Sequence, residues 1–127
     1  MNDLRFHHLG IAVKDLEKSI AQIRALGYQI SDNVYDPAQD ASLIFCKHSS
    51  MPSLELIYNP DRFKSILKGQ DFVIYHICFE THNINKALSN FERKVTIKKP
   101  CPAKLFNNRE VSFFKIDGLG IVELLEE

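Results

Sequence analysis

The sequence predicts an α+β fold built from two copies of one module, each a strand, a helix and three further strands. The main observation is an internal repeat, in which the segment that starts at His8 matches the segment that starts at His76. The offset of 68 residues holds without a gap into the last predicted strands, where Glu55 meets Glu123. A fixed period of this kind indicates a duplicated supersecondary unit. The second observation is that each copy places an apolar helical face directly after a strand rich in β-branched and aromatic residues.

The length of 127 residues fits one domain, and a hydrophobic content of 45% suffices for a packed core. Within this single domain, residues 1–127, we expect module one at about residues 5–59 and module two at about residues 71–127. The residues between them, about 60–70, form a linker whose apolar positions indicate a short helix that ends at Gly69.

Module one begins with a strand at FHHLGIAV, and Asp15 caps the helix that follows. This helix should run to Leu26, where Gly27 supplies a stop. Its apolar face consists of Leu16, Ile20, Ile23 and Leu26. Three further strands are expected near YQISDNV, ASLIFCK and SLELIYN.

Module two repeats this order from the strand that starts at His76. Asn83 takes the capping position of Asp15, and a second helix follows it. The apolar face of this helix consists of Ile84, Ala87, Leu88 and Phe91. Its three later strands are expected near VTIKK, EVSFFKI and IVELLEE.

Two polar residues recur at matching places in these strands, a histidine in the first and a glutamate in the last. The spacing from His8 to Glu55 is 47 residues, and so is the spacing from His76 to Glu123. Side chains alternate across a strand, so each module offers both residues on the sheet face away from its helix. Two such faces that meet by pseudo-symmetry would bring two imidazoles and two carboxylates together.

This donor set predicts one divalent metal ion. Burying a glutamate between aliphatic neighbours is costly unless a cation offsets the cost. Imidazole and carboxylate suit Zn²⁺, Ni²⁺, Co²⁺, Mn²⁺ or Fe²⁺ without choosing among them. Four protein ligands leave octahedral positions open, which is typical of catalytic rather than structural sites. A lone strand histidine is usually hydrogen-bonded or solvated, so His7, which falls on the opposite face from His8, is not expected to be a ligand.

Composition excludes several other classes of protein. Acids and bases balance at 16 each, so no nucleic acid or anionic membrane is expected as a partner. No apolar run reaches the roughly 20 residues of a membrane-spanning helix, and the N-terminal segment lacks the apolar region of a signal peptide. The three cysteines lack metal-type spacing and are expected to be reduced thiols in a cytoplasmic protein.

The motifs resemble the vicinal oxygen chelate superfamily, which includes glyoxalase I, methylmalonyl-CoA epimerase, extradiol dioxygenases and bleomycin-resistance proteins. The segments HHLGIAVKDLEKSI and YHICFETHNI look most like the epimerase branch. The resemblance covers nearly the whole chain and implies a glyoxalase-like fold, in which paired βαβββ modules form a metal-centred cup, commonly in a homodimer. The family's metal-ligand positions fall on His8, Glu55, His76 and Glu123.

Other positions resemble either glyoxalase I or the epimerases, but not both. LELIYNP looks like glyoxalase I, where an asparagine at the position of Asn59 holds glutathione. Glyoxalase I usually has an arginine where this chain has Ala12, and the epimerases usually have a glutamate near the position of Ser42. The substrate therefore stays open between a glutathione thiohemiacetal and an acyl-CoA.

Both branches imply a metal-dependent isomerase or lyase that moves an α-proton on a thiol-linked carbonyl compound. In that reaction Glu123 and Glu55 would each serve as metal ligand and as acid or base, with Glu123 the stronger candidate. Strand parity also allows Glu80 and Glu110 to reach the site, although strand-end glutamates are usually solvated. The alternatives are a small-molecule-binding or resistance protein without catalysis, and a metal-dependent transferase or oxygenase of the same fold.

Overall fold

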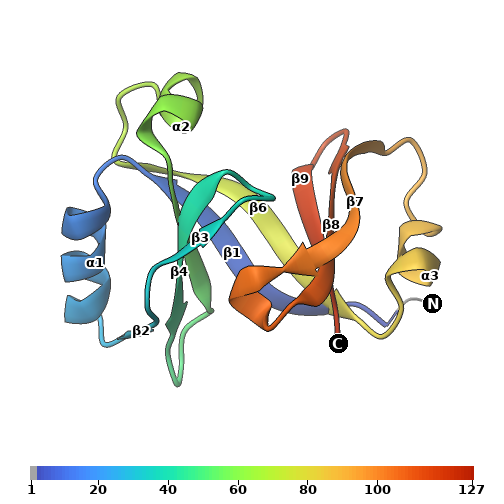
Figure 1. Ribbon diagram of the computed structural model, residues 1–127, viewed down its shortest axis with the longest axis horizontal. Coiled ribbons are helices and arrows are strands. Elements are labelled where there is room, and N and C mark those ends of the chain that lie inside the picture. The colour runs from blue at the N-terminus through green and yellow to red at the C-terminus, as the bar shows by residue number, and fades with distance from the viewer. Residues whose placement is uncertain (1–2) are drawn as a thin grey trace. The chain divides into compact units, whose positions relative to one another are not determined.

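The computed structural model describes residues 3–127, in which nine strands and three α-helices follow one another in the predicted α+β order (Figure 1). The chain divides into two compact units. One unit is His8–Tyr75, and the other joins residues 3–7 to His76–Glu127. Among the described residues, no helix combines the length and the apolar character needed to cross a membrane.

The unit His8–Tyr75 contains strands in the order β2-β4-β5-β1, with β3 beside β4. The first strand runs parallel to the last, and the remaining pairs are antiparallel. The bounds are β1 (Arg5–Val13), β2 (Gln29–Ile30), β3 (Val34–Asp36), β4 (Ala41–Lys47) and β5 (Leu54–Tyr58).

The single strand predicted at residues 28–34 is wrong, because β2 and β3 are two short strands with a break between them. Ser31 lies in this break. Its hydroxyl oxygen accepts the backbone N–H of Phe45 at 2.8 Å, and its own N–H donates to the Phe45 carbonyl at 2.9 Å. A side-chain oxygen thus replaces a backbone acceptor, which ends the regular ladder.

Helix α1 (Leu16–Ala25) lies against the strands of this unit, at the left of Figure 1. The Asp15 carboxylate accepts the backbone N–H of Lys18 at 3.1 Å, as an N-cap does. Leu26 was expected on the buried face but is 58% exposed, because the helix ends at Ala25 and Leu26 is its C-cap. The stop follows as predicted at Gly27, where φ is +94°.

Helix α2 (Pro60–Leu67) forms in the predicted linker, with Asn59 as its N-cap. Pro60 suits the first turn of a helix, where no backbone donor is needed. The helix ends one residue earlier than expected, because Lys68 adopts the left-handed conformation ahead of Gly69, with φ +49°. Its N–H still donates to the Lys64 carbonyl at 3.1 Å, which satisfies the last turn.

The second unit contains strands in the order β6-β9-β8-β7. The bounds are β6 (Phe72–Thr81), α3 (Ile84–Leu88), β7 (Val95–Ala103), a 3-10 turn at Lys104–Phe106, β8 (Arg109–Ile116) and β9 (Gly120–Glu126). Asn83 caps α3 as predicted. Phe91 lies beyond the end of this short helix but still packs against the buried cluster beneath it. Strand β7 extends past the predicted residues 95–99, through Pro100 and Pro102, since it lies at the end of the strand order.

Residues 3–7 are held to the second unit by polar contacts. Asp3 accepts hydrogen bonds from the Thr81 hydroxyl and the His82 backbone N–H, both at 2.7 Å. The His82 bond is the main reason why the pKa of Asp3 lies below its usual value. Arg5 donates to the Glu127 carboxylate at 3.0 Å.

The internal repeat holds at the level of strand register. In the parallel pairs, Gly10 lies opposite Glu55 in one unit and Cys78 opposite Glu123 in the other. The antiparallel pairs obey the same offset of 68 residues, with Phe45 opposite Glu55 and Phe113 opposite Glu123. Register controls which face each side chain takes, so both units build the surroundings of their glutamate in the same way.

Candidate functional site

In the unit His8–Tyr75, the predicted histidine and glutamate form a buried pair. His8 lies on β1 and Glu55 on the parallel neighbour β5, and neither side chain has any exposed surface. The imidazole Nε2 lies 3.8 Å from a carboxylate oxygen of Glu55. The ring of Phe45 meets the imidazole edge-on, with centroids 5.5 Å apart, which fixes its tilt.

The second unit contains the equivalent pair, His76 on β6 and Glu123 on β9. His76 is 1% exposed and Glu123 is fully buried. The Nε2 of His76 lies 3.1 Å from a carboxylate oxygen of Glu123. Phe113 meets this imidazole in the same edge-on manner, with centroids 5.4 Å apart. Each unit therefore presents one imidazole and one carboxylate in nearly identical surroundings.

The chemistry of these pairs fits a divalent metal ion. Buried glutamates are rare in proteins, and each of these two lies on a strand whose neighbouring side chains are apolar. Removing a carboxylate from water is costly unless a cation or strong donors compensate. Imidazole nitrogen and carboxylate oxygen are the donors that first-row divalent ions prefer.

Asn59, the predicted substrate-binding residue, has a structural task. Its side-chain oxygen accepts the backbone N–H of Arg62 at 3.2 Å, which caps α2. Its side-chain nitrogen donates to the Asp40 carbonyl at 2.8 Å. The side chain is thus engaged at both ends, and a contact with substrate stays a prediction.

The two further glutamates that strand parity allowed are not buried like Glu55 and Glu123. Glu80 forms ion pairs with Arg109 and with Arg5, whereas Glu110 is exposed. Burial acts to raise the pKa of Glu80, but the hydrogen bond and charge of Arg109 outweigh it, so that this pKa is lowered. A lowered pKa makes Glu80 a weaker base than an ordinary glutamate.

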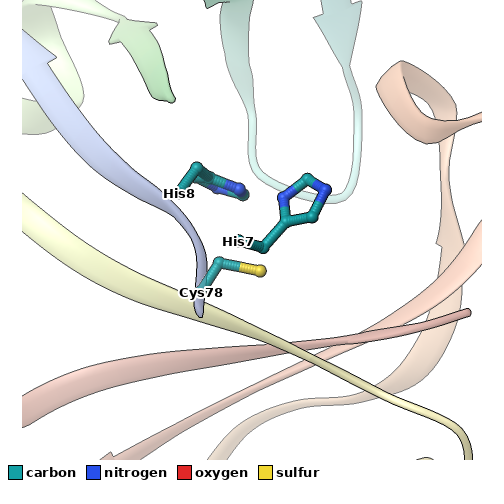
Figure 2. Close-up of side chains that lie close together, drawn as sticks. All are labelled: His7, His8 and Cys78. Carbon is teal, nitrogen blue, oxygen red and sulfur yellow. The ribbon is translucent and has the colours of Figure 1, made fainter. Parts of the chain in front are cut away.

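Figure 2 shows a neighbour of His7 that sequence reasoning missed, the Cys78 thiol. A ring nitrogen of His7 and the sulfur of Cys78 lie within 4.8 Å of each other, and the thiol is fully buried. The ring of Phe106 meets the His7 ring edge-on at 5.5 Å. Alternation along β1 predicts that His7 and His8 point to opposite faces of the strand. It does not predict which residues of the neighbouring strand β6 lie close to His7.

The three cysteines are free thiols. Burial raises the pKa of the Cys46 thiol to about 11, so this group stays protonated at neutral pH. Cys101 is only partly buried, on the edge strand β7.

A separate cavity of about 490 Å³ lies beside α1 in the unit His8–Tyr75. Its apolar lining includes Ile11, Ile23 and Leu56, and Phe72 stands at its margin with half of its surface exposed. Neither His8 nor Glu55 lines it, because the odd-numbered residues of β1 face the helix.

Each of the two units begins with a strand and a helix and continues with further strands, and each contains a buried His–Glu pair at the same register. These features define a protein of the duplicated glyoxalase-like class. A family model described as the glyoxalase/bleomycin resistance protein/dioxygenase superfamily matches residues 7–113. The chain belongs to this superfamily, which confirms the family resemblance and the fold class predicted from the sequence.

Similar proteins within the superfamily are methylmalonyl-CoA epimerases. The human mitochondrial methylmalonyl-CoA epimerase is 34% identical over 95 residues, which cover 71% of this chain and 53% of the human protein. The chain thus spans about half the length of the curated relatives it matches. Among solved structures, the Mycobacterium tuberculosis epimerase has a TM-score of 0.77 at 19% identity, covering 95% of this chain and 86% of that one. A Streptomyces coelicolor epimerase in complex with 2-nitronate-propionyl-CoA has a TM-score of 0.75 at 18% identity, covering 97% and 96% of the two chains.

Proposed function

We propose that this protein is an isomerase of the acyl-CoA epimerase type, which moves the proton on the carbon next to a thioester carbonyl. The observation that carries this proposal is the buried His–Glu pair present at the same register in both units. Similarity to methylmalonyl-CoA epimerases supports the choice of a CoA thioester as substrate. The metal and the particular acyl group are further parts of the proposal.

The proposed metal ligands are His8, Glu55, His76 and Glu123. The support is the chemistry of each pair taken by itself, together with the family to which the chain belongs. When bound, a divalent ion supplies a Lewis acid that stabilises negative charge on the substrate carbonyl oxygen. Zn²⁺, Ni²⁺, Co²⁺, Mn²⁺ and Fe²⁺ all accept these donors.

Glu123 is the proposed base. Its carboxylate takes the α-proton, and the electron pair of the broken C–H bond moves toward the thioester carbonyl. A protonated acid then returns a proton to the opposite face of the same carbon, so the product is the epimer and no atom is gained or lost. Glu55 is the second candidate for this acid–base chemistry. Both carboxylates are buried, where charge on a general base interacts more strongly with the reacting group than it would in water.

Solvent deuterium exchange tests this assignment. We expect Glu123→Gln to reduce exchange into the α-carbon of methylmalonyl-CoA, per bound metal, by about 10²–10⁴-fold, because the amide keeps an oxygen donor but loses basicity. Glu110→Gln is the matched control, since Glu110 is an exposed glutamate on the neighbouring strand β8. Exchange at the wild-type rate in the Glu123→Gln variant would remove Glu123 as the base.

The same assay separates the other candidate activities. Methylglyoxal with glutathione tests the lactoylglutathione lyase activity, which depends on Asn59 as a substrate contact. Binding of either substrate without exchange would instead indicate a small-molecule-binding or resistance protein. We further propose that the protein is a homodimer, as the family resemblance implies.

A further inference from the structure

Although the net charge is zero, basic and acidic residues are unevenly distributed along the chain. Residues 93–109 contain six basic residues and no acidic one, while the rest of the chain contains ten basic and sixteen acidic residues. The segment therefore carries a formal charge of +6 and the remainder −6. The six are Arg93, Lys94, Lys98, Lys99, Lys104 and Arg109. Such a concentration of one sign is an electrostatic attractor for anions.

Only part of this charge is used within the protein. Arg109 is bound to Glu80, and the Lys94 ammonium donates to the Phe91 carbonyl at 3.1 Å. By contrast, the other four are exposed and form no ion pair within the described part of the chain; they are Arg93, Lys98, Lys99 and Lys104. Four cations thus remain available to an external anion.

Two irregularities of strand β7 lie on either side of Lys98, and the second of them falls in the interval that contains Lys99. Moving from Thr96 to Lys98 advances the partner strand by one residue, from Phe114 to Phe113, so one residue of β7 is extra. A second extra residue lies between Lys98 and Cys101. Such bulges bend a strand and redirect its side chains, and they are common next to binding sites.

Strand register relates Lys98 to the proposed base within the same unit. Lys98 lies opposite Phe113 on β8, and Phe113 lies opposite Glu123 on β9. Residues directly opposite each other point to the same face of a sheet. Lys98 is therefore on the face that presents Glu123 and is two strand spacings, about 10 Å, away along the backbone.

We infer that the basic segment of β7, centred on Lys98 and Lys99, binds the phosphate groups of the CoA nucleotide. This inference depends on the proposed function, since it extends the same site to the far end of its substrate. A CoA thioester carries its reactive carbon at one end of a long pantetheine arm and its diphosphate and 3′-phosphate at the other. The segment matches this layout, with Lys98 on the face of Glu123 at a distance from it, and Lys99 next to Lys98 where the strand is irregular. The exposed side chains of Val95 and Ile97 beside them offer apolar surface to the arm.

A structural explanation competes with this inference. Lysine and proline on an edge strand hinder pairing with other chains, and β7 contains both. If the lysines only prevent pairing of the edge strand, no ligand is needed. Removing Lys98 and Lys99 should then increase association between chains and leave the affinity for CoA unchanged.

The decisive variant is Lys98→Gln/Lys99→Gln, with Lys64→Gln/Lys86→Gln as its control. The control removes two exposed lysines from α2 and α3, outside the basic segment. The measurements are the Kd of free CoA by calorimetry and the KM of methylmalonyl-CoA and of methylmalonyl-pantetheine, which lacks the nucleotide. Charge-assisted bonds to phosphate contribute enough that we expect the Kd and the KM for the CoA compounds to rise at least about tenfold. The KM for the pantetheine thioester should stay unchanged, and the control should behave like the wild type.

The outcomes separate this inference from the function on which it depends. Equal CoA affinity in the wild type and the Lys98→Gln/Lys99→Gln variant would overturn the inference, and sedimentation of the same samples would reveal a role in preventing association. An equal rise in KM for both thioesters would also overturn it, because the lysines would then act on the shared acyl end. Absence of exchange on any thioester, with CoA binding that still depends on Lys98 and Lys99, would reject the proposed function and leave the phosphate site standing.

Discussion

Burial separates the histidines of this protein into two groups. His8 and His76 are inaccessible and lie beside carboxylates, whereas His7 and His48 are partly buried and His82 is largely exposed. Each buried imidazole thus has its Nε2 close to a carboxylate oxygen of its own unit, which is the pair of donor atoms that the proposed metal site needs.

We expect His8→Ala and His76→Ala each to reduce metal affinity at least about tenfold, because each variant removes a nitrogen donor from the proposed site. His7→Ala is the matched control, being the adjacent residue on the same strand with its ring against Phe106. Elemental analysis after dialysis against a weak chelator measures the effect. Loss of metal in the His7 variant together with retention in the His8 variant would show that strand parity misassigned the ligand.

The two pairs were predictable because the sequence contains them twice. One buried glutamate in SLELIYN would have been ambiguous, but a second at the same spacing from a second histidine is hard to explain by chance. The closeness of His7 to Cys78 was not predictable, because it depends on a neighbouring strand that alternation within β1 does not describe. The double role of Asn59 in capping α2 and bonding to Asp40 was hidden for the same reason.

Among the elements, the cavity beside α1 lies in the first copy of the repeat, in the unit His8–Tyr75. The repeat places Phe79 and Phe91 where the first copy has Ile11 and Ile23. In the second unit both rings pack against the buried cluster under α3, and Phe91 lies 4.9 Å from the ring of Phe114. Smaller aliphatic side chains at these positions account for part of the space left open in the unit His8–Tyr75.

Ile11→Phe/Ile23→Phe should therefore stabilise the protein. Filling apolar space contributes at most about 0.8 kcal/mol per added carbon, and the cost of fitting two rigid rings offsets much of it. We therefore expect a gain of about 1–2 kcal/mol in the free energy of unfolding and a melting midpoint higher by roughly 4–8 °C. Ile66→Phe, on the exposed side of α2, should change the midpoint little. Calorimetry compares the three proteins. A lower midpoint in the double variant would mean that the cavity cannot take the rings without strain.

The elements themselves were predicted where their signals are local. The strand ASLIFCK coincides with β4, and the caps at Asp15 and Asn83 begin α1 and α3 as expected. The predicted strand bounds were wrong where they depend on a contact with a distant part of the chain. Ser31 interrupts its strand by bonding to Phe45, and β7 tolerates two prolines because it lies at the end of its strand order.

For the whole molecule, the proposed homodimer is the property that remains to be measured. Strand β6 exposes two large apolar side chains, Phe72 at 54% and Ile74 at 59%. Apolar surface of this kind on neighbouring positions of one strand favours association with another chain. Sheet edges that a partner covers would also be protected from aggregation.

We expect sedimentation equilibrium at micromolar concentration to give the mass of a dimer. Ile74→Asp should weaken the dimer by about tenfold or more, because it introduces a charge into the proposed contact. Ile66→Asp changes a comparably exposed isoleucine, 43% exposed on α2, and should leave the mass unchanged. A wild-type monomer across this concentration range would contradict the proposal.

The attachment of residues 3–7 to the second unit has a consequence for synthesis. The unit His8–Tyr75 is one continuous stretch, so it can fold while the ribosome is still translating the rest. Asp3 and Arg5 emerge earlier still, yet their partners Thr81 and Glu127 follow 78 and 122 residues later. At on the order of 10 residues per second, this segment is made roughly ten seconds before Glu127. The second unit is therefore completed only after the unit His8–Tyr75 has been synthesised, and a chain interrupted before Glu127 would leave Arg5 without that carboxylate.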